Sequence, residues 1–244
     1  MTVAANALVV ANLSKWFNGL AVARDVNLVV RAGEAVGLLG RSGAGKSTVF
    51  GAIAGAIAPD SGRILLDGRD IGPLEVDKRA RLGVGYIPQA PQLFSELTVE
   101  QNLLIAIEHR EPDRMARRRL LDELLATYGL TGWRDRRLTA LSGGERRQCE
   151  IAFVMSTRPR FMLLDEPFTG LDPLVSAAVR TRIGGMKAMG LGILVTDHKV
   201  RDALSLVDRA YIIDGGEIVA SGTPAELVAD ERVRAAYLGA NFRN

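Results

Sequence analysis

The segment Gly40-Arg41-Ser42-Gly43-Ala44-Gly45-Lys46-Ser47 has the spacing of a phosphate-binding loop, G-x-x-x-x-G-K-[ST]. It follows the apolar run 35–39 and leads through Thr48 into a helix-compatible run that ends at Ala58. In this context the N–H groups of a glycine-rich turn and of a helix N-terminus face the phosphate oxygens. Lys46 is expected to reach the β- and γ-phosphates, and the Ser47 hydroxyl to ligate Mg²⁺. The sequence therefore predicts a nucleoside triphosphate site at residues 40–48.

The composition is that of an ordinary globular protein. Of the 244 residues, 48% are hydrophobic and 24% are charged, which provides ample core. No apolar run is long enough to span a bilayer, and residues 1–13 lack the basic segment of a signal peptide. A net charge of +3 does not argue for nucleic acid, and two histidines with one cysteine argue against zinc. The lone Cys149 fits a reducing compartment and is expected to pack in the core.

Apolar runs separated by turn residues predict an α/β fold with a mostly parallel sheet. Between residues 99 and 128, charged residues interleave with Leu, Ile and Met at helical spacing, which predicts a helical subdomain at roughly 95–158 within a single domain, 1–244. The arginines at 117–119, 134, 136 and 137 form either a solvated helix face or a contact with a partner or lipid headgroups. The predicted strands are 7–11, 26–30, 35–39, 63–66, 161–164, 193–196, 210–213 and 217–220, the last two forming a hairpin.

Two adjacent acids end a buried strand. Asp165 follows the apolar run 161–164 and precedes Glu166. Ligands of open α/β sheets bind at the carboxyl ends of the strands, so Asp165 is expected to hold Mg²⁺ opposite Ser47. Glu166 is then placed to polarise a water for in-line attack on the γ-phosphate. The alternative is a pair of acids that only cap a turn before Pro167.

A second anion site is predicted at Leu141-Ser142-Gly143-Gly144-Glu145. Ser142 and Glu145 form a capping box, so a helix begins here and runs to about Met155. The two glycines leave N–H groups of the first turn uncovered. Because the phosphate loop already holds its own phosphates, this helix start is suited to a nucleotide held by another subunit.

The chain resembles the ATP-binding subunits of ABC transporters over essentially its whole length. The resemblance rests on six features in the family's order: the phosphate loop, Gln89 in the run 86–89, the segment 141–145, Asp165-Glu166, Leu171-Asp172 and His198 after the run 195–197. It implies the ABC ATPase fold, a P-loop NTPase core with an N-terminal antiparallel β-subdomain and an inserted α-helical subdomain. The family commonly has an arginine where Phe153 stands, a departure that bears on interface details.

The resemblance also implies roles for individual residues. Two copies would form a head-to-tail homodimer around two Mg-ATP, with Ser142 and Gly144 contacting the γ-phosphate on the partner's loop. Gln89 would help ligate Mg²⁺, His198 would orient the attacking water, and Asp172 would join the two sites. Phe17, or less well Trp16, matches the aromatic that stacks on adenine, with Val22 nearby. Gly143 and Glu145 complete the segment that meets the partner.

Within the family, residues 191–198 and 236–243 look most like the ATPases of bacterial lipopolysaccharide export. The run 141–151 agrees with that subgroup. Branched-chain amino-acid importer ATPases share part of the C-terminal pattern and are the competing prediction. Only 46 residues (244 − 198) follow His198, too few for the regulatory β-domain of sugar-importer ATPases.

The sequence argues against two functions from other classes. A chromosome-maintenance ATPase head would carry a long coiled coil between Ser47 and Ser142, where no sustained heptads occur. A non-hydrolytic ATP-gated binding module would not need Glu166 and His198.

The expected location is the cytoplasmic face of the inner membrane. There, integral-membrane transporter subunits would dock in a groove beside Gln89, and Leu93, Phe94 and Leu97 either line that groove or pack the helical subdomain.

Overall fold

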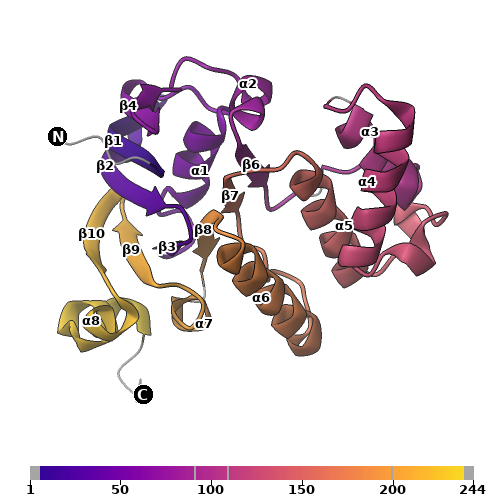
Figure 1. Cartoon of the computed structure of the whole chain (residues 1–244). Helices are drawn as coiled ribbons and strands as arrows, with labels where there is room; N and C mark the ends of the chain where they lie inside the picture. Colours follow the sequence, from indigo (N-terminus) through magenta and orange to yellow (C-terminus); the bar gives the residue numbers. More distant parts are fainter. Residues whose placement is uncertain (1–5, 91, 109, 199, 239–244) are drawn as a thin grey trace.

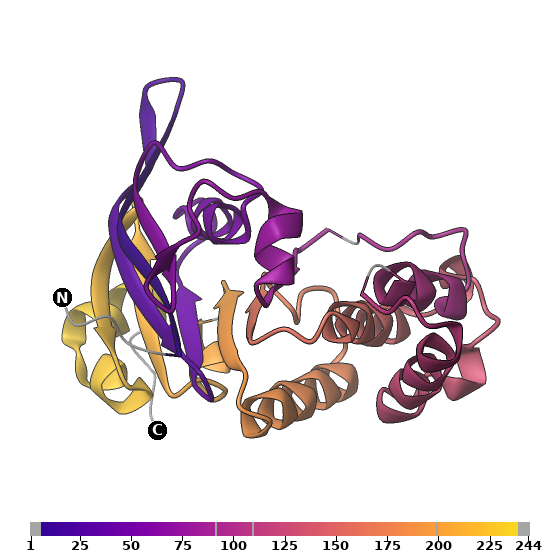
Figure 2. The same cartoon turned by 45° about the horizontal axis from the view of Figure 1, so that its top comes forward.

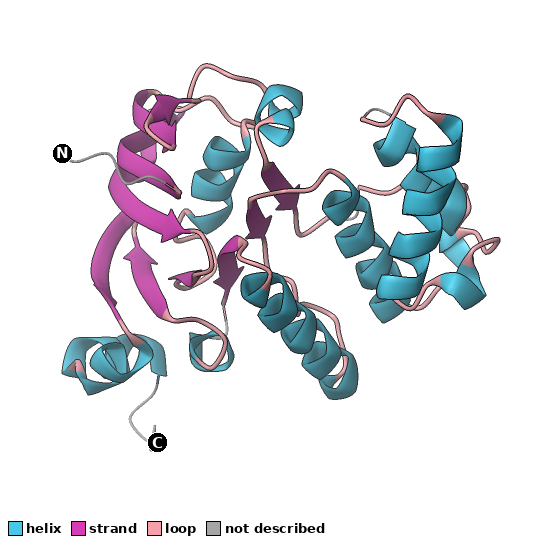
Figure 3. Ribbon diagram, viewed as in Figure 1, coloured by secondary structure: helices cyan, strands magenta, loops and turns pink. Residues whose placement is uncertain are grey.

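The structure is a computed structural model that describes residues 6–90, 92–108, 110–198 and 200–238. Strands gather on one side of the molecule, and a group of helices forms a lobe on the other (Figures 1 and 3). The described ranges exclude His109 and also residues 239–243, which belong to the C-terminal stretch 236–243. Within those ranges, no helix is long and apolar enough to cross a membrane.

The N-terminal sheet is antiparallel, as the resemblance implies, with strand order β2-β1-β4-β5. The β1–β2 hairpin is longer than the sequence predicts and projects from one end of the molecule (Figure 2). Its polar residues are tolerated because the strands continue beyond the core into solvent. The four strands are β1 (Ala7–Phe17), β2 (Leu20–Arg31), β4 (Ser61–Leu66) and β5 (Arg69–Asp70).

The second sheet has the order β10-β9-β3-β8-β7-β6, and every neighbouring pair except β10–β9 is parallel. This confirms the predicted α/β class and the C-terminal hairpin. β6 was not predicted from the sequence. Gln89 follows this strand by two residues. The strands are β3 (Ala35–Leu39), β6 (Val84–Ile87), β7 (Phe161–Leu164), β8 (Gly192–Asp197), β9 (Arg209–Asp214) and β10 (Glu217–Gly222).

The stretch predicted as helical from 99 to 128 holds two helices separated at Pro112, and Asp113 caps the second by accepting a bond from the Ala116 N–H. The predicted cap at Ser142 is confirmed, and the side chains of Asp172 and Thr223 cap α6 and α8. The helices are α1 (Lys46–Ala54), α2 (Val76–Arg81), α3 (Val99–Glu108), α4 (Arg114–Thr127), α5 (Gly143–Ser156), α6 (Pro173–Ala188), α7 (Val200–Leu204), α8 (Pro224–Ala229) and α9 (Glu231–Val233), with short helical turns at Thr131–Trp133, Leu138–Ala140 and Arg234–Leu238.

Two of the arginines near the helical lobe join its parts. Arg134 bonds both Glu100 on α3 and Asp122 on α4, at 2.6 and 2.7 Å. Arg117 bonds Glu108 and the carbonyl of Glu111 across the α3–α4 connection. This structural role differs from both predictions for the arginine cluster, which were a solvated helix face and a contact with a partner or lipid headgroups.

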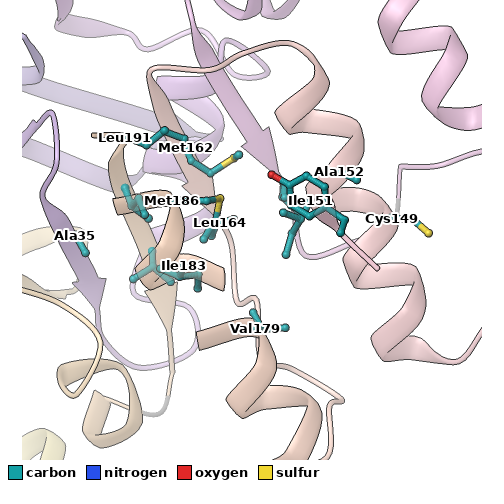
Figure 4. Packing of buried hydrophobic residues seen from close by; sticks show 14 of the residues in the cluster. Ala35, Cys149, Ile151, Ala152, Met162, Leu164, Val179, Ile183, Met186 and Leu191 are labelled. Carbon is teal, nitrogen blue, oxygen red and sulfur yellow. The ribbon is translucent and has the colours of Figure 1, made fainter. Parts of the chain in front are cut away.

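The alternation of side chains along the strands divides the core in two. Val36 and Leu38 of β3 pack with the antiparallel sheet and α1, whereas Ala35 and Leu39 face the helices on the other side. Figure 4 shows this second cluster, where Met162 and Leu164 of β7 meet Ile183 and Met186 of α6 and Ile151 of α5.

Cys149 confirms its expected packing role. Its side chain points away from the sheet (Figure 4), and the residue is buried in the same cluster. Burial raises the pKa of its thiol to about 12, so the thiolate form is suppressed at neutral pH.

Arg79 of α2 is a buried residue that the sequence analysis did not single out. Its guanidinium donates to the carbonyls of Ala52 and Ile53 at the end of α1, and to those of Gly72 and Leu74. α1 ends at Ala54, four residues before the predicted end at Ala58. Gly55 follows it with a left-handed backbone at φ +90°. Arg79 thus satisfies carbonyls that a helix end leaves without partners, and it ties α2 to the helix that begins at the phosphate loop.

We therefore expect Arg79→Met to lower the free energy of unfolding by roughly 2–4 kcal/mol, because buried carbonyls lose a charged donor. Denaturant unfolding monitored by circular dichroism measures this change. Arg81→Met, which removes an exposed ion pair with Asp77, serves as the control and should change stability by less than about 1 kcal/mol. Equal effects of the two substitutions would contradict the role of Arg79.

Candidate functional site

Four predicted segments meet because they follow neighbouring parallel strands. The phosphate loop follows β3, His198 follows β8, Asp165 follows β7 and Gln89 follows β6. The strand register pairs Leu39 with Asp197, Val195 with Leu164, and Leu164 with Ile87, so the strand ends lie within two residues of one another. These residues therefore converge at one edge of the sheet, where ligands of open α/β sheets bind.

A cavity of about 730 Å³ opens above the phosphate loop. Of the predicted nucleotide-binding residues, Gly40, Ala44 and Phe17 do not line it. Phe17 lies at the end of β1, is 44% exposed, and has the Lys15 ammonium 5.3 Å from its ring centroid. The cavity is lined by Val22, Arg41, Ser42, Gly43, Gly45, Lys46, Ser47, Thr48, Gln89, Glu166, Thr169 and His198.

At two positions of the phosphate loop, neighbouring backbone lies too close to leave room for any residue other than glycine. A side chain at Gly40 would lie 2.2 Å from the Ile213 carbonyl, and one at Gly45 would lie 2.3 Å from the Val22 carbonyl. Gly45 also has φ +102°, a conformation that side chains rarely adopt. The loop is therefore fixed against β9 and β2 as well as shaped for an anion.

Lys46 is held at the base of the cavity. Its ammonium donates to the carbonyls of Gly40 and Arg41, at 2.9 and 2.8 Å. Burial lowers the pKa of Lys46, and the carboxylates of Glu166, Asp165 and Asp197 oppose that shift. A cation that is little exposed and donates to carbonyls in this way is suited to bind a phosphate oxygen.

One carboxylate oxygen of Glu166 is the centre of a polar cluster. Its Oε2 accepts hydrogen bonds from the Gln89 side-chain amide at 3.0 Å and from the Thr169 hydroxyl at 3.1 Å. The Nδ1 of His198 lies 3.5 Å from the same oxygen. Glu166 has φ +47°, a left-handed backbone conformation that is uncommon and costly for a residue other than glycine. The structure thus gathers Gln89, Glu166 and His198 beside the phosphate loop.

Thr196 positions both acids and was missed by the sequence analysis. It is fully buried, and its hydroxyl donates to Asp165 Oδ1 at 2.6 Å and accepts from the Glu166 N–H at 2.8 Å. Thr169 was missed as well. The available signal for Thr196 was its place directly after the apolar run 193–195, because a buried hydroxyl requires a partner.

The predicted Mg²⁺ ligands suit that ion chemically. Ser47 and Gln89 line the cavity and offer oxygen, and the buried Asp165 adds a carboxylate behind them. Within the described ranges, no group of three or more His, Cys, Asp or Glu side chains could hold a metal by itself.

The segment 141–145 forms the start of α5, apart from the phosphate-loop cavity. Ser142 and Glu145 make the reciprocal capping bonds, and the Asp172 carboxylate caps α6 through the Val175 N–H. A side chain at Gly144 would lie 2.6 Å from Val175, so this glycine is needed where α5 meets the start of α6. Of this segment, Gly143 alone borders a cavity shared with Gln89 and Glu166, of about 200 Å³.

Arg41 of the phosphate loop is held by the C-terminal segment. Its guanidinium donates to the Ala236 carbonyl at 2.8 Å and lies 5.6 Å from the centroid of the Tyr237 ring. The C-terminal segment of the described chain therefore contacts the phosphate loop.

Phe153 lies in a groove of α5 next to Pro88 and Leu93 and does not line the phosphate-loop cavity. The departure from the family pattern at this position therefore concerns the groove. Of the three apolar residues predicted near the groove, Leu93 lines it, whereas Phe94 and Leu97 do not. Phe94 is 55% exposed.

Comparison with known proteins agrees with this geometry. The family model "ABC transporter" matches residues 23–169, and "Branched-chain amino acid ATP-binding cassette transporter" matches residues 217–243. A probable ABC transporter ATP-binding protein of Azorhizobium caulinodans is 48% identical over 98% of this chain and 85% of its own length. The lipopolysaccharide export system ATP-binding protein LptB of Haemophilus influenzae is 43% identical over 97% of this chain and 98% of its own.

A solved structure has the same fold. MJ1267, an ATP-binding cassette of an ABC transporter, superposes with a TM-score of 0.87 at 26% identity, over 97% of this chain and 100% of its own. The sequence, the sheet order and the convergence of these motifs at one sheet edge have the same explanation: the chain belongs to the family of ABC transporter ATP-binding proteins.

Proposed function

We propose that this chain hydrolyses ATP to drive lipopolysaccharide export from the inner membrane. ATP-binding subunits of the family hydrolyse ATP, dimerise and work with membrane transporter subunits. The export assignment is supported by the 43% identity to LptB of both Haemophilus influenzae and Escherichia coli, over nearly the full length of each chain. On this proposal, the chain acts at the cytoplasmic face of the inner membrane.

The observation that carries the hydrolytic function is the set of contacts at Glu166. Its Oε2 accepts from Gln89 and Thr169 beside the phosphate-loop cavity, with His198 Nδ1 at 3.5 Å. In the proposed reaction Lys46 and the loop N–H groups hold the β- and γ-phosphates, and His198 orients a water. Glu166 accepts a proton as the water oxygen bonds to the γ-phosphorus and the bond to the β-phosphate oxygen breaks.

Ser47, Gln89 and Asp165 are the residues proposed to hold Mg²⁺, which would neutralise phosphate charge when bound. Val22 borders the nucleotide cavity. Phe17 remains the proposed adenine contact, and its exposed ring would have to pack against a base that extends out of the cavity.

The site is proposed to be composite. Ser142 and Gly143 are exposed at the start of α5, and a helix N-terminus suits an anion, yet Ser142 does not border the chain's own phosphate-loop cavity. We infer that Ser142, Gly143 and the Gly144 backbone complete the γ-phosphate site of a second copy, with Glu145 and Asp172 at the same interface.

A branched-chain amino-acid importer is the second candidate. It is favoured by the family match over residues 217–243, which includes the C-terminal stretch that also suggested export. That stretch therefore does not separate the two functions, and the choice between them rests on the membrane partners.

Glu166→Gln should reduce kcat roughly 10²- to 10⁴-fold because the proton acceptor is lost while the contacts to phosphate remain. The variant should bind ATP and accumulate as a dimer, as measured by phosphate release and by light scattering during gel filtration. Glu217→Gln, an exposed carboxylate on β10, is the matched control. Hydrolysis at the parent rate would remove Glu166 from the proposed role.

Phe94 is the proposed contact with the membrane subunits. Its ring is exposed, while its backbone N–H and carbonyl are both bonded to the buried Asn102 side chain, at 2.9 and 3.1 Å. An exposed aromatic on a fixed backbone is a favourable anchor for a partner. Phe94→Ala should therefore bind ATP like the parent but recover less of the membrane subunits on affinity purification.

Mass spectrometry of the recovered membrane proteins tests the assignment to export. Subunits whose depletion leaves lipopolysaccharide in the inner membrane would support it, whereas a branched-chain amino-acid permease would support the second candidate. Undiminished recovery with Phe94→Ala would reject the contact.

A further inference from the structure

The first half of α4 exposes a cluster of arginines around one apolar side chain. Its exposed residues are Arg114, Met115, Arg118 and Arg119, whereas three leucines in the second half of the helix are buried. Met115 is 66% exposed. Side chains three and four positions apart are neighbours on a helix surface, so Met115 lies beside both Arg118 and Arg119. These four residues, named here the basic face of α4, belong to the helical lobe (Figure 1).

The positive charge of the chain is concentrated in this part of the sequence. Residues 110–119 contain five arginines and two acids, a net charge of +3 (5 − 2) that equals the net charge of all 244 residues. Arg117 is engaged inside the lobe, where it bonds Glu108 and two backbone carbonyls. No described carboxylate forms an ion pair with Arg114 or Arg119. Because like charges one helical turn apart destabilise a helix, this cluster suits an anion from outside the chain.

The basic face borders the surface that carries Phe94, the proposed contact with the membrane subunits. Arg134 joins Glu100 at the start of α3 to α4. The hydrogen bond from Arg134 lowers the pKa of Glu100, and the nearby charge of Arg118 lowers it further. Two residues after Glu100, Asn102 bonds the backbone of Phe94. A chain attached to the membrane subunits through Phe94 would therefore hold the basic face near the surrounding bilayer.

The chemistry of this face favours a lipid surface over an inserted protein segment. The cavities of the described ranges are lined by other residues. Guanidinium groups bind phosphate oxygens through paired hydrogen bonds. A long apolar side chain among cations is typical of helices that lie at a bilayer surface, where it enters the headgroup region. The anionic phospholipids of a cytoplasmic leaflet attract such segments.

We propose that the basic face of α4 binds the headgroups of anionic phospholipids in the cytoplasmic leaflet beside the membrane subunits. The three guanidinium groups donate hydrogen bonds to phosphate oxygens, and the Met115 side chain enters the headgroup layer. The membrane location rests on the proposed function, but the partner is lipid rather than a transporter subunit. The contact adds a second attachment to the bilayer and fixes the orientation of the helical lobe toward it.

Vesicle sedimentation with the purified full-length chain measures the contact without membrane subunits. The parent should bind vesicles of equal parts phosphatidylglycerol and phosphatidylcholine but not phosphatidylcholine alone, and binding should weaken as salt is raised. One arginine near an anionic surface contributes about fivefold in affinity. The triple variant Arg114→Gln, Arg118→Gln, Arg119→Gln should therefore bind roughly 100-fold more weakly, and it keeps a residue that favours the helix at each position.

A matched control removes the same charge elsewhere. The control variant is Arg63→Gln, Arg69→Gln, Arg158→Gln, three exposed residues outside α4. It should bind the anionic vesicles like the parent. Equal losses in the two triple variants would mean that net charge alone attracts the chain, and they would overturn the proposal, as would a parent chain that does not bind.

A fluorescent label locates the contact on the surface of the chain. Cys149 is buried and the pKa of its thiol is raised to about 12 by that burial, so a new surface cysteine reacts selectively. A polarity-sensitive dye on Met115→Cys should shift its emission to the blue when anionic vesicles are added. The same dye on Met189→Cys, an exposed position just after α6, should not shift. A shift at residue 189 alone, or at neither position, would contradict the proposal.

An acidic segment of a membrane subunit is the alternative occupant of the basic face. The arginine triple variant of α4 should recover the membrane subunits from detergent extracts like the parent, because lipid is replaced there. Loss of that recovery would assign the face to a protein and overturn the lipid contact. A parent chain that binds anionic vesicles but recovers no membrane subunit would contradict the transporter assignment and leave the lipid contact standing, so the two failures are distinguishable.

Discussion

The parallel pairing of β3, β8, β7 and β6, with strand ends within two residues of one another, is the constraint on which the rest of the molecule depends. Each strand ends at the same edge, and each is followed directly by a functional segment. The residues involved are spread along the sequence from Gly40 to His198, and the sheet brings them together. A shift of one residue in any pair would turn that strand's apolar side chains toward the wrong half of the core, so core packing also fixes the site.

Within that frame, the polar groups are held by partners that leave few alternatives. Thr196 links the two acids, Gln89 and Thr169 share one oxygen of Glu166, and the left-handed backbone of Glu166 is maintained by these surroundings. Strain of this kind is found at sites where a side chain must be aimed. The arrangement joins the γ-phosphate region to the Gln89 segment, and from there to the surface proposed for the membrane partner.

The sequence predicted those parts of the fold and site that depend on local patterns. The phosphate loop, the helix cap at Ser142, and the strands 35–39 and 161–164 all have a pattern that can be recognised within a few residues. Arg79, Asn102 and Thr196 were not predicted, because their partners are carbonyls or side chains brought close only by the tertiary structure. The end of α1 at Gly55 depends on that glycine and on Arg79 together. The groove position of Phe153 could not be inferred until the packing of α2, α3 and α5 was known.

The central claim is that one chain carries two halves of different sites, and mixing two inactive variants tests it most directly. Lys46→Ala removes the phosphate contact, and Ser142→Arg blocks the surface offered to the other copy. Each variant alone should be inactive, because every dimer then has two defective sites. Equal mixtures should regain ATP hydrolysis, since a mixed dimer has one site in which intact Lys46 meets intact Ser142. A mixture as inactive as its components, or full activity of Ser142→Arg alone, would contradict the composite site.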